Sequence, residues 1–184
     1  MAVGSHEATS HEATRDPRQT ARERAVWEAL AAVPDPEIPA VSVVDLGMVR
    51  SVEVDGERLR VELLPTFVGC PALDLIRETV AARLAGMARE VVVEVSFAEP
   101  WTSERITMEG RRKLRESGFA PPATRAPGSD GQPLFTTITA RPTAVCPYCD
   151  SRDTAMENPF GPTLCRAIFY CNHCRQPFEQ FKAV

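Results

Sequence analysis

Four of the six cysteines in this sequence carry its most specific chemical signal. They form two Cys-x-x-Cys pairs separated by 21 residues: Cys146, Cys149, Cys171 and Cys174. Each pair can direct both sulfurs at one ion, and two pairs complete a tetrahedral shell of four thiolates. The surrounding segment is too small to bury a core unaided, so metal binding must supply much of its folding free energy. We predict one structural zinc per chain, with iron held as in rubredoxin as the main rival.

Two other functions are compatible with such pairs. A single Cys-x-x-Cys can be a redox motif, so thiol–disulfide exchange is an alternative. Two pairs around a hairpin-like insert favour a zinc ribbon instead. Zinc ribbons often bind nucleic acid. This chain, however, has a net charge of −4 and an isoelectric point near 5.5, so it does not have the excess of basic residues that nucleic-acid binders normally show. We therefore expect no nucleic-acid partner.

Two further potential ligands, Cys165 and His173, lie in the same C-terminal segment. His173 falls inside the second cysteine pair, where the geometry of its ring makes it a poor fifth ligand. We expect it to be exposed. Cys165 is either a buried residue or a second reactive thiol, and its spacing leaves both interpretations open.

The sixth cysteine, Cys70, lies where an alternating, strand-like segment ends and a helix-like segment begins. Pro65 ends the alternation, and Pro71 suits the first position of a helix because it needs no N–H partner there. Cys70 is then expected at the N-cap, with free backbone N–H groups and the positive end of the helix dipole beside its sulfur. Such surroundings favour the thiolate, which binds metals or attacks electrophiles. The alternative is a small, buried, apolar cysteine.

A rigid acidic loop precedes this segment in the chain. Periodic apolar residues predict a helix over residues 20–33. Three prolines within the next six residues stop the helix and stiffen the loop that carries Asp35 and Glu37. Two acids held in this way can assist metal chemistry, while turn initiation explains Asp35 equally well.

The middle of the chain predicts a small α+β domain. Asp55-Gly56 lies between the alternating runs 48–54 and 57–63, which is the strongest short signal for a β-hairpin. A helix is expected over 71–85 and a buried strand over 91–95. The order helix, strand, strand, helix, strand predicts an α+β fold with helices on one face of a sheet, followed by a C-terminal zinc ribbon.

A last helix is expected within residues 101–119, capped by Ser103, weakened by Gly110 and ended by Gly118. It carries the most basic patch of the sequence: Arg111, Arg112, Lys113 and Arg115. A solvated helix face is the simplest interpretation. Docking onto an acidic partner protein is the alternative, because such patches steer encounter.

Composition divides the chain into four parts. A disordered tail is expected over 1–19, the α+β domain over 20–119, a linker over 120–143 and the ribbon over 144–184. The linker holds one short extended run, 134–139. No apolar run is long enough to cross a membrane. The N-terminus lacks a secretory signal, so we expect a cytoplasmic protein whose cysteines are ligands or reactive thiols before disulfides.

Several short motifs resemble known families when they are taken in order. The N-terminal part resembles the iron–sulfur assembly domain of SufT-type and cytosolic iron–sulfur targeting proteins. The motifs concerned are Asp35-Pro36-Glu37-Ile38-Pro39, Asp45-Leu46-Gly47 and Thr66-x-x-Gly69-Cys70-Pro71. Residues 20–184 as a whole resemble the PaaD family, the accessory subunits encoded with the bacterial phenylacetyl-CoA epoxidase. That likeness adds Trp101, Gly110-Arg111-x-Lys113-Leu114, Phe160-Gly161-Pro162-Thr163 and the four-cysteine ribbon.

The resemblance implies an accessory factor in phenylacetate catabolism that assists iron or iron–sulfur centre assembly and is not itself a catalyst. Its implied partners are the oxygenase subunit, with a carboxylate-bridged di-iron centre, and the reductase subunit, with flavin and an iron–sulfur cluster. Cys70 becomes a ligand of iron or a cluster, supported by Asp35, Glu37 and Thr66. A stoichiometric, non-catalytic subunit of the oxygenase complex is the alternative. One thiolate cannot hold a cluster alone, so a bound cluster would be transient, or shared across a homodimer or with a partner.

Overall fold

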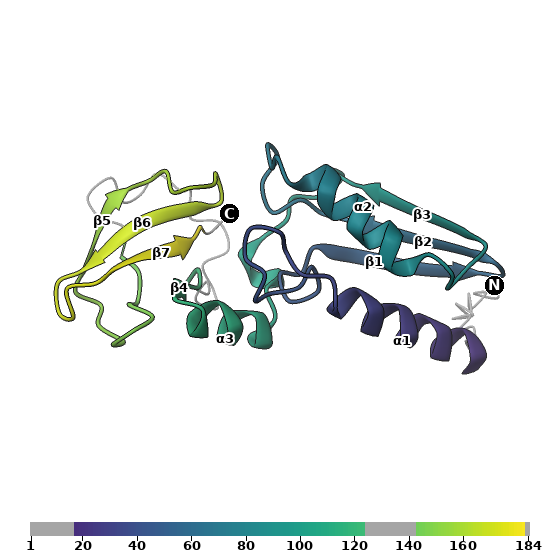
Figure 1. Cartoon of the computed structure of the whole chain (residues 1–184), viewed down its shortest axis with the longest axis horizontal. Helices are drawn as coiled ribbons and strands as arrows, with labels where there is room; N and C mark the ends of the chain where they lie inside the picture. The colour runs from purple at the N-terminus through teal and green to yellow at the C-terminus, as the bar shows by residue number, and fades with distance from the viewer. Residues whose placement is uncertain (1–16, 124–142, 183–184) are drawn as a thin grey trace, which may run out of the picture.

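A computed structural model of the chain describes residues 17–123 and 143–182. The N-terminal unit contains two helices and a three-stranded sheet (Figure 1). In chain order its elements are α1 (Pro17–Ala31), β1 (Val49–Asp55), β2 (Arg58–Leu63), α2 (Leu73–Leu84) and β3 (Glu90–Val95). The predicted order of helix, strand, strand, helix, strand is confirmed.

The sheet follows the order β1-β2-β3. β1 and β2 form the predicted antiparallel hairpin, with Asp55 opposite Arg58. The turn therefore consists of Gly56 and Glu57, and Gly56 has a φ of +55°, which a residue without a Cβ adopts at little cost. α2 then crosses over so that β3 runs parallel to β2, with Leu63 opposite Val95.

Both helices pack on one face of this sheet. Val26 and Leu30 of α1, and Ile76 and Val80 of α2, share a core with the inward-facing residues of β2. The apolar face of α1 that carries Val26 and Leu30 was predicted from the periodicity of the sequence.

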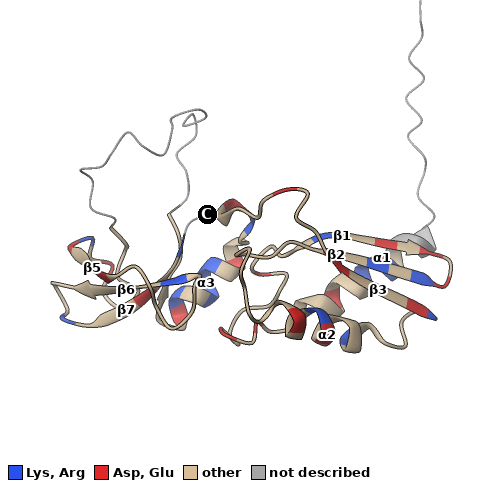
Figure 2. Cartoon of the chain, turned by 90° about the horizontal axis from the view of Figure 1, so that it is seen from above, with Lys and Arg blue, Asp and Glu red and all other residues tan. Residues whose placement is uncertain are grey.

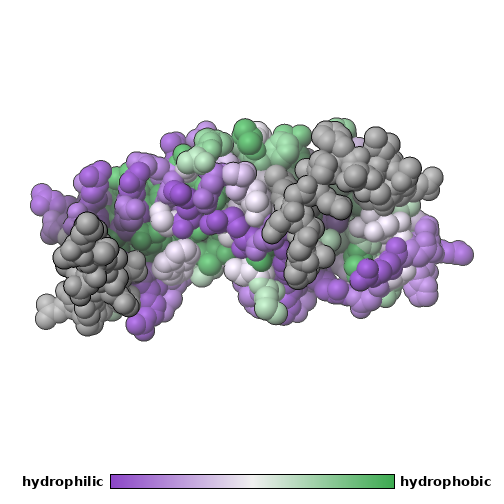
Figure 3. All heavy atoms as spheres, turned by 180° about the vertical axis from the view of Figure 1, so that it is seen from behind, coloured by the Kyte–Doolittle hydropathy of each residue, from purple (hydrophilic) through white to green (hydrophobic). Residues whose placement is uncertain are grey.

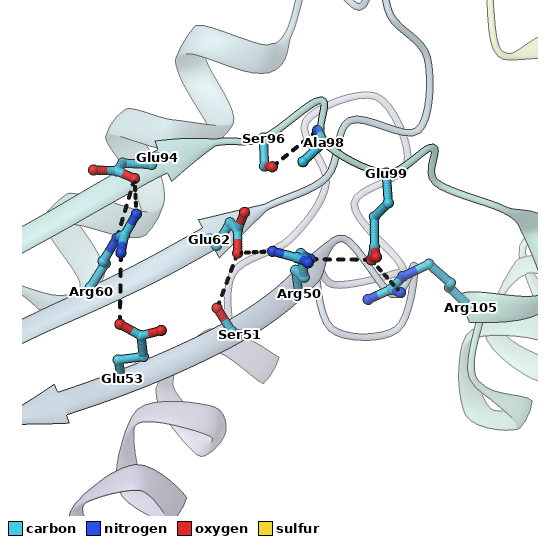
Figure 4. A network of polar contacts seen from close by, with 10 residues as sticks. All are labelled: Arg50, Ser51, Glu53, Arg60, Glu62, Glu94, Ser96, Ala98, Glu99 and Arg105. Atoms are coloured by element: carbon cyan, nitrogen blue, oxygen red, sulfur yellow. Dashed lines mark hydrogen bonds and ion pairs between the residues drawn. The ribbon is translucent and has the colours of Figure 1, made fainter.

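The opposite face of the sheet carries a charged ladder, shown in Figure 4. Arg60 on the central strand lies 2.7 Å from Glu94 and 3.8 Å from Glu53 on the two neighbouring strands. A second chain of contacts runs from Glu62 through Arg50 to Glu99. This face is therefore satisfied by its own ion pairs and remains in contact with solvent.

The C-terminal unit is a ribbon whose sheet also includes a short strand, residues 119–120, from much earlier in the chain (Figure 1). The elements that follow β3 are the 3₁₀ turn η1 (Ser103–Arg105), α3 (Met108–Glu116), β4 (Phe119–Ala120), β5 (Thr154–Asn158), β6 (Arg166–Cys171) and β7 (Pro177–Phe181). The sheet order is β4-β7-β6-β5, and β4 pairs parallel to β7. The strand that directly follows α3 is thus the edge strand of the ribbon sheet.

Side chains also join the two units. Phe181, at the end of β7, is 3% exposed and belongs to the core of the N-terminal unit. Its ring meets Trp101 edge-on, with 5.9 Å between the ring centroids. The guanidinium of Arg166 lies 5.6 Å from the centroid of the Phe119 ring. The ribbon is therefore packed against the first unit through an apolar contact of its last strand.

The predicted capping of α3 was wrong. Ser103 begins the separate turn η1, and the N-cap of α3 is Thr107, whose Oγ1 accepts a hydrogen bond from the N–H of Gly110 at 2.9 Å. Gly110 is not a weak point, because a Cβ at this position would lie 2.4 Å from the carbonyl oxygen of Asp45. The glycine allows α3 to approach the loop before β1. Gly118 ends the helix region as expected, with a φ of +84°.

Figure 2 shows Lys and Arg positions along α3. The side chains of these basic residues contact other residues of the chain. Arg111 donates to the carbonyl oxygens of Ser103 and Pro122, and Lys113 lies 2.7 Å from Asp45 Oδ2. Arg112 pairs with Glu109 and Glu116 on the same helix, and Arg115 pairs with Asp150 of the ribbon. These contacts favour a structural role for the patch over docking onto an acidic partner.

Some predictions lie partly or wholly outside the described residues. The expected tail 1–19 is described only from residue 17, the extended run 134–139 is not described, and the linker 120–143 is described only at its two ends. The proposed limits of the four parts stay predictions. Among the described residues, no helix is both long enough and apolar enough to span a membrane.

Candidate metal-handling sites

The four predicted ligands converge at the end of the ribbon away from the N-terminal unit. The ligand atoms of Cys146, Cys149, Cys171 and Cys174 all lie within 4.8 Å of one another. The Sγ atoms of Cys146 and Cys174 are 3.6 Å apart, as are those of Cys149 and Cys171. Tetrahedral zinc with bonds of about 2.3 Å requires sulfurs separated by about 3.8 Å. The arrangement therefore fits a four-coordinate metal ion.

The backbone around these cysteines is shaped to stabilise thiolates. The N–H groups of Tyr148 and Cys149 point at Cys146 Sγ, and those of His173 and Cys174 point at Cys171 Sγ. Such N–H donors stabilise the negative charge of a metal-bound thiolate. His173 is exposed, as predicted. Among the described residues this is the only group of three or more potential ligands whose ligand atoms are already gathered.

Cys70 lies in the turn before α2, but it is not the N-cap. The helix begins at Leu73 with Ala72 as its N-cap, because Pro71 and Ala72 form a turn that delays the helix. The N–H groups of Ala72 and Leu73 nevertheless face Cys70 Sγ. The side chain is half-buried. The expected approach of helix N–H groups to this sulfur is therefore present, two residues later than predicted.

The expectation that Cys70 favours the thiolate was wrong in sign. Burial raises the pKa of Cys70 above its ordinary value, and the charges of Glu37 and Asp35 raise it further against the two N–H groups. A metal ion would reverse this balance, since a positive charge bound between a thiol and carboxylates favours the ionised form of each. The surroundings suit a ligand for a cation better than a free nucleophile.

The two carboxylates of the acidic loop, Asp35 and Glu37, make different contacts. Asp35 Oδ1 accepts hydrogen bonds from the N–H groups of Glu37 and Ile38, both at 2.9 Å. This is the turn-forming role that the sequence left open beside a metal role. Burial raises the pKa of Asp35 above its usual range. Glu37 is half-buried and its carboxylate faces the ribbon instead.

The structure brings one further residue to this loop, Cys165 of the ribbon. Its Sγ lies 3.5 Å from Glu37 Oε2 and 3.2 Å from Thr163 Oγ1. The side chain packs against the core of the N-terminal unit. Burial raises the pKa of Cys165 to about 11. Sequence spacing could not place this contact, because it joins residues 128 positions apart; the only available signal was that Cys165 remained after the four ribbon ligands were assigned.

Thr66 lies in the segment between β2 and α2 that also carries Cys70. It is buried and lines a cavity of about 310 Å³ together with Pro65, Phe97 and Trp101. The lining of this cavity is mostly apolar, with Glu99 as its one charged residue, and Val68 and Phe97 are 80% and 60% exposed. Apolar surface is visible in the middle of the long edge of the molecule in Figure 3. Thr66 therefore lies beside a hydrophobic hollow, and its role at the metal site stays a prediction.

Residues of the other sequence motifs, Trp101, Asp45 and Lys113 among them, hold the segment between the acidic loop and β1 in place. Trp101 Nε1 donates to the carbonyl oxygen of Leu46 at 2.8 Å, and Arg105 Nε donates to that of Gly47 at 3.0 Å. Asp45 Oδ2 accepts from the N–H and hydroxyl of Ser42 and contacts Lys113. The residues between the acidic loop and β1 are thereby fixed to α3 and η1.

The fold and the sites define a class of protein in which an α+β unit, with a cysteine in the turn before its second helix, is joined to a ribbon that gathers four cysteines. Two family matches agree with this class. Residues 23–97 match the family "Iron-sulfur cluster assembly protein", and residues 130–182 match the family "PaaD zinc beta ribbon domain".

Comparison with single proteins identifies the family of the whole chain. It is 36% identical, over 160 residues, to an Escherichia coli (strain K12) protein that is named as a subunit of 1,2-phenylacetyl-CoA epoxidase. The match covers 86% of this chain and 92% of that protein. The chain belongs to this family, the PaaD family.

Solved structures resemble the N-terminal unit. A domain of unknown function, DUF59, from Bacillus anthracis is 31% identical with a TM-score of 0.50, covering 53% of this chain and 94% of that one. The conserved hypothetical protein TM0487 from Thermotoga maritima is 32% identical with a TM-score of 0.42, covering 50% and 92%. The Bacillus anthracis domain supports the α+β fold of residues around the candidate site.

Proposed function

We propose that this protein is an accessory factor that assists assembly of an iron or iron–sulfur centre in a phenylacetyl-CoA epoxidase. Family membership supports the epoxidase as the system served, since the Escherichia coli relative is named as one of its subunits. The match of residues 23–97 to iron–sulfur cluster assembly proteins supports the assembly role. The oxygenase and reductase subunits are the proposed recipients, in a reducing cytoplasm where free thiols persist.

One observation carries the proposal: a half-buried thiol that faces two backbone N–H groups and feels the charges of two acidic residues, Glu37 and Asp35. In our account Cys70 binds the iron or cluster as cargo. Glu37 contributes negative charge beside it, and Asp35 holds the loop that positions Glu37. A site with fewer protein ligands than the four that a stable cluster normally takes can pass its cargo on.

We assign the ribbon a structural zinc. Four thiolates in a tetrahedral arrangement suit zinc, which would link the two turns of the ribbon without redox chemistry. The backbone donors to the sulfurs and the family description of residues 130–182 support this assignment. Zinc bound in this way argues against thiol–disulfide exchange, because the sulfurs that would cycle are then ligands.

The test of the proposed function replaces Cys70 by Ser in cells that express the epoxidase. We expect the iron content of the isolated oxygenase or reductase subunit to fall several-fold, with epoxidase activity falling in parallel. The matched control is Ser117→Ala, at the exposed end of α3. Unchanged iron loading in the Cys70→Ser cells would remove the maturation role.

A stoichiometric, non-catalytic subunit is the second candidate function. The apolar cavity beside Thr66, with Val68 and Phe97 exposed at its rim, is a surface that a permanent partner would cover. Co-purification of this chain with the oxygenase at an equal ratio would favour this candidate. Full activity of an iron-loaded complex reconstituted without this chain would favour the maturation role.

A further inference from the structure

The contact between the ribbon and the acidic loop brings the thiol of Cys165 beside the carboxylate of Glu37, close to the turn that carries Cys70. Cys165 Sγ lies 3.5 Å from Glu37 Oε2, and the charge of Glu37 also acts on Cys70. The residues just before the two cysteines lie together as well, since a Cβ on Gly69 would be 3.9 Å from Leu164 Cδ1. Three segments that are far apart in sequence thus bring potential metal ligands into the same region, at the boundary of the two units.

The ribbon holds Cys165 in place through its own contacts. Thr163 Oγ1 lies 3.2 Å from Cys165 Sγ and accepts a hydrogen bond from Arg166 Nε at 2.8 Å. The backbone of Cys165 accepts a hydrogen bond from the N–H of Lys182, next to β7, at 2.9 Å. The turn that carries this sulfur is therefore fixed to both neighbouring strands.

This thiol is separate from the four-cysteine centre. Cys165 directly precedes β6, whereas the ribbon ligand Cys171 ends it. Six residues of strand span about 20 Å. Cys165 therefore cannot serve as an additional ligand of the ribbon metal, and its position instead faces the loop of Asp35 and Glu37.

We propose that Cys165 is a second protein ligand for the iron cargo, and that Cys70, Glu37 and Cys165 together form a site between the two units. Two thiolates and one carboxylate suit Fe²⁺, which accepts both sulfur and oxygen donors. Three protein ligands leave coordination positions open through which a recipient protein can take over the ion. Each thiol releases its proton when the metal binds.

In this proposal the site closes around its cargo. Only the four ribbon cysteines, among the described residues, already hold their ligand atoms within 4.8 Å of one another. Cys70, Glu37 and Cys165 must therefore approach one another when iron binds. This inference rests on the proposed function, because it adds a ligand to the iron site that Cys70 defines, and it gives the ribbon a part in holding the cargo.

The test uses the full chain with its ribbon zinc in place, titrated with Fe²⁺ or with Co²⁺ as a spectroscopic probe in the absence of air. Thiolate-to-cobalt charge-transfer absorption increases with the number of sulfur ligands. We expect Cys165→Ser to lose about half of this absorption or more and to weaken Fe²⁺ binding at least tenfold. Glu37→Gln should weaken binding while keeping the sulfur signal. Glu157→Gln, at an exposed position of β5, is the matched control.

The outcomes separate this inference from the proposed function. Unchanged absorption and affinity in both Cys165→Ser and Cys165→Ala would overturn the second ligand and leave Cys70 in its role. Unchanged absorption and affinity in Cys70→Ser would overturn the proposed function itself. One zinc per chain in every variant, measured by elemental analysis, verifies that the ribbon is intact.

Discussion

The two acids of the proline-rich loop differ in what their side chains do. One carboxylate oxygen of Asp35 accepts hydrogen bonds from the backbone of its own loop, whereas the carboxylate of Glu37 contacts Cys165 of the ribbon. The sequence predicted that both are rigidly held, because prolines fix the backbone on either side. It could not rank them, because the partner of Glu37 comes from a segment more than a hundred residues away.

The titration of Cys70 is the prediction at the scale of single residues. Burial and the neighbouring carboxylates hold its pKa above the ordinary value of 9.0, so little thiolate is present at neutral pH. Glu37→Gln removes one charge that opposes ionisation, and the pKa should fall. We expect the midpoint of the alkylation rate against pH, followed at the Cys70 peptide by mass spectrometry, to shift to lower pH in this variant. Glu157→Gln should leave the midpoint in place, and a midpoint that also stays in place in Glu37→Gln would contradict the electrostatic account.

At the scale of elements, local signals predicted most of the secondary structure. The Asp55-Gly56 pair predicted the β-hairpin, although its turn is Gly56-Glu57, and the cysteine spacing predicted the ribbon. The start of α2 was predicted two residues too early. Pro71 is compatible with a turn as well as with the first position of a helix, and in the structure it lies in a turn. The cap of α3 was missed for a similar reason: Ser103 and Thr107 are both good caps, and only the approach of α3 to Asp45 selects the second.

Gly110 tests that approach. Gly110→Ala improves the intrinsic helix propensity by about 1 kcal/mol, but the new Cβ would meet the backbone oxygen of Asp45 at 2.4 Å. Because backbone atoms cannot move aside easily, we expect net destabilisation of about 1–3 kcal/mol in urea unfolding. Met108→Ala, at a residue of the same helix that is 89% exposed, should change stability by less than about 0.5 kcal/mol. Equal stability of Gly110→Ala and the parent chain would show that the close approach is not real.

At the scale of the whole molecule, the two units share a core, and the sequence did not predict this. Composition indicated a separate domain, a linker and a ribbon, since the intervening residues are rich in proline, glycine, serine and threonine. Phe178 and Phe181 are three residues apart in β7 and therefore lie on opposite faces of the strand; Phe178 packs in the ribbon core, whereas Phe181 packs in the core of the N-terminal unit. The contact of Phe181 with Trp101 forms only in the tertiary structure, and no local sequence pattern specifies it. The site at the boundary of the units escaped prediction for the same reason.

Removal of the ribbon metal should therefore change the packing of the N-terminal unit. Trp27→Phe leaves Trp101 as the only tryptophan, 2% exposed and in contact with Phe181. A chelator under reducing conditions should unfold the ribbon and expose Trp101 to water. We expect a red shift of its fluorescence emission that added zinc reverses. Emission that stays unchanged after one zinc per chain has been released would contradict the shared core.

The most direct test of the central claim is transfer of iron from this chain to its proposed recipients. The chain is loaded with ⁵⁷Fe without air and mixed with iron-free oxygenase or reductase subunits and an excess of a soluble iron chelator. We predict that the wild-type chain delivers ⁵⁷Fe to at least one recipient despite the chelator, and that Cys70→Ser delivers at least tenfold less. Delivery by Cys70→Ser at the wild-type level, or delivery that the chelator abolishes for the wild-type chain, would contradict a role for this protein in iron transfer.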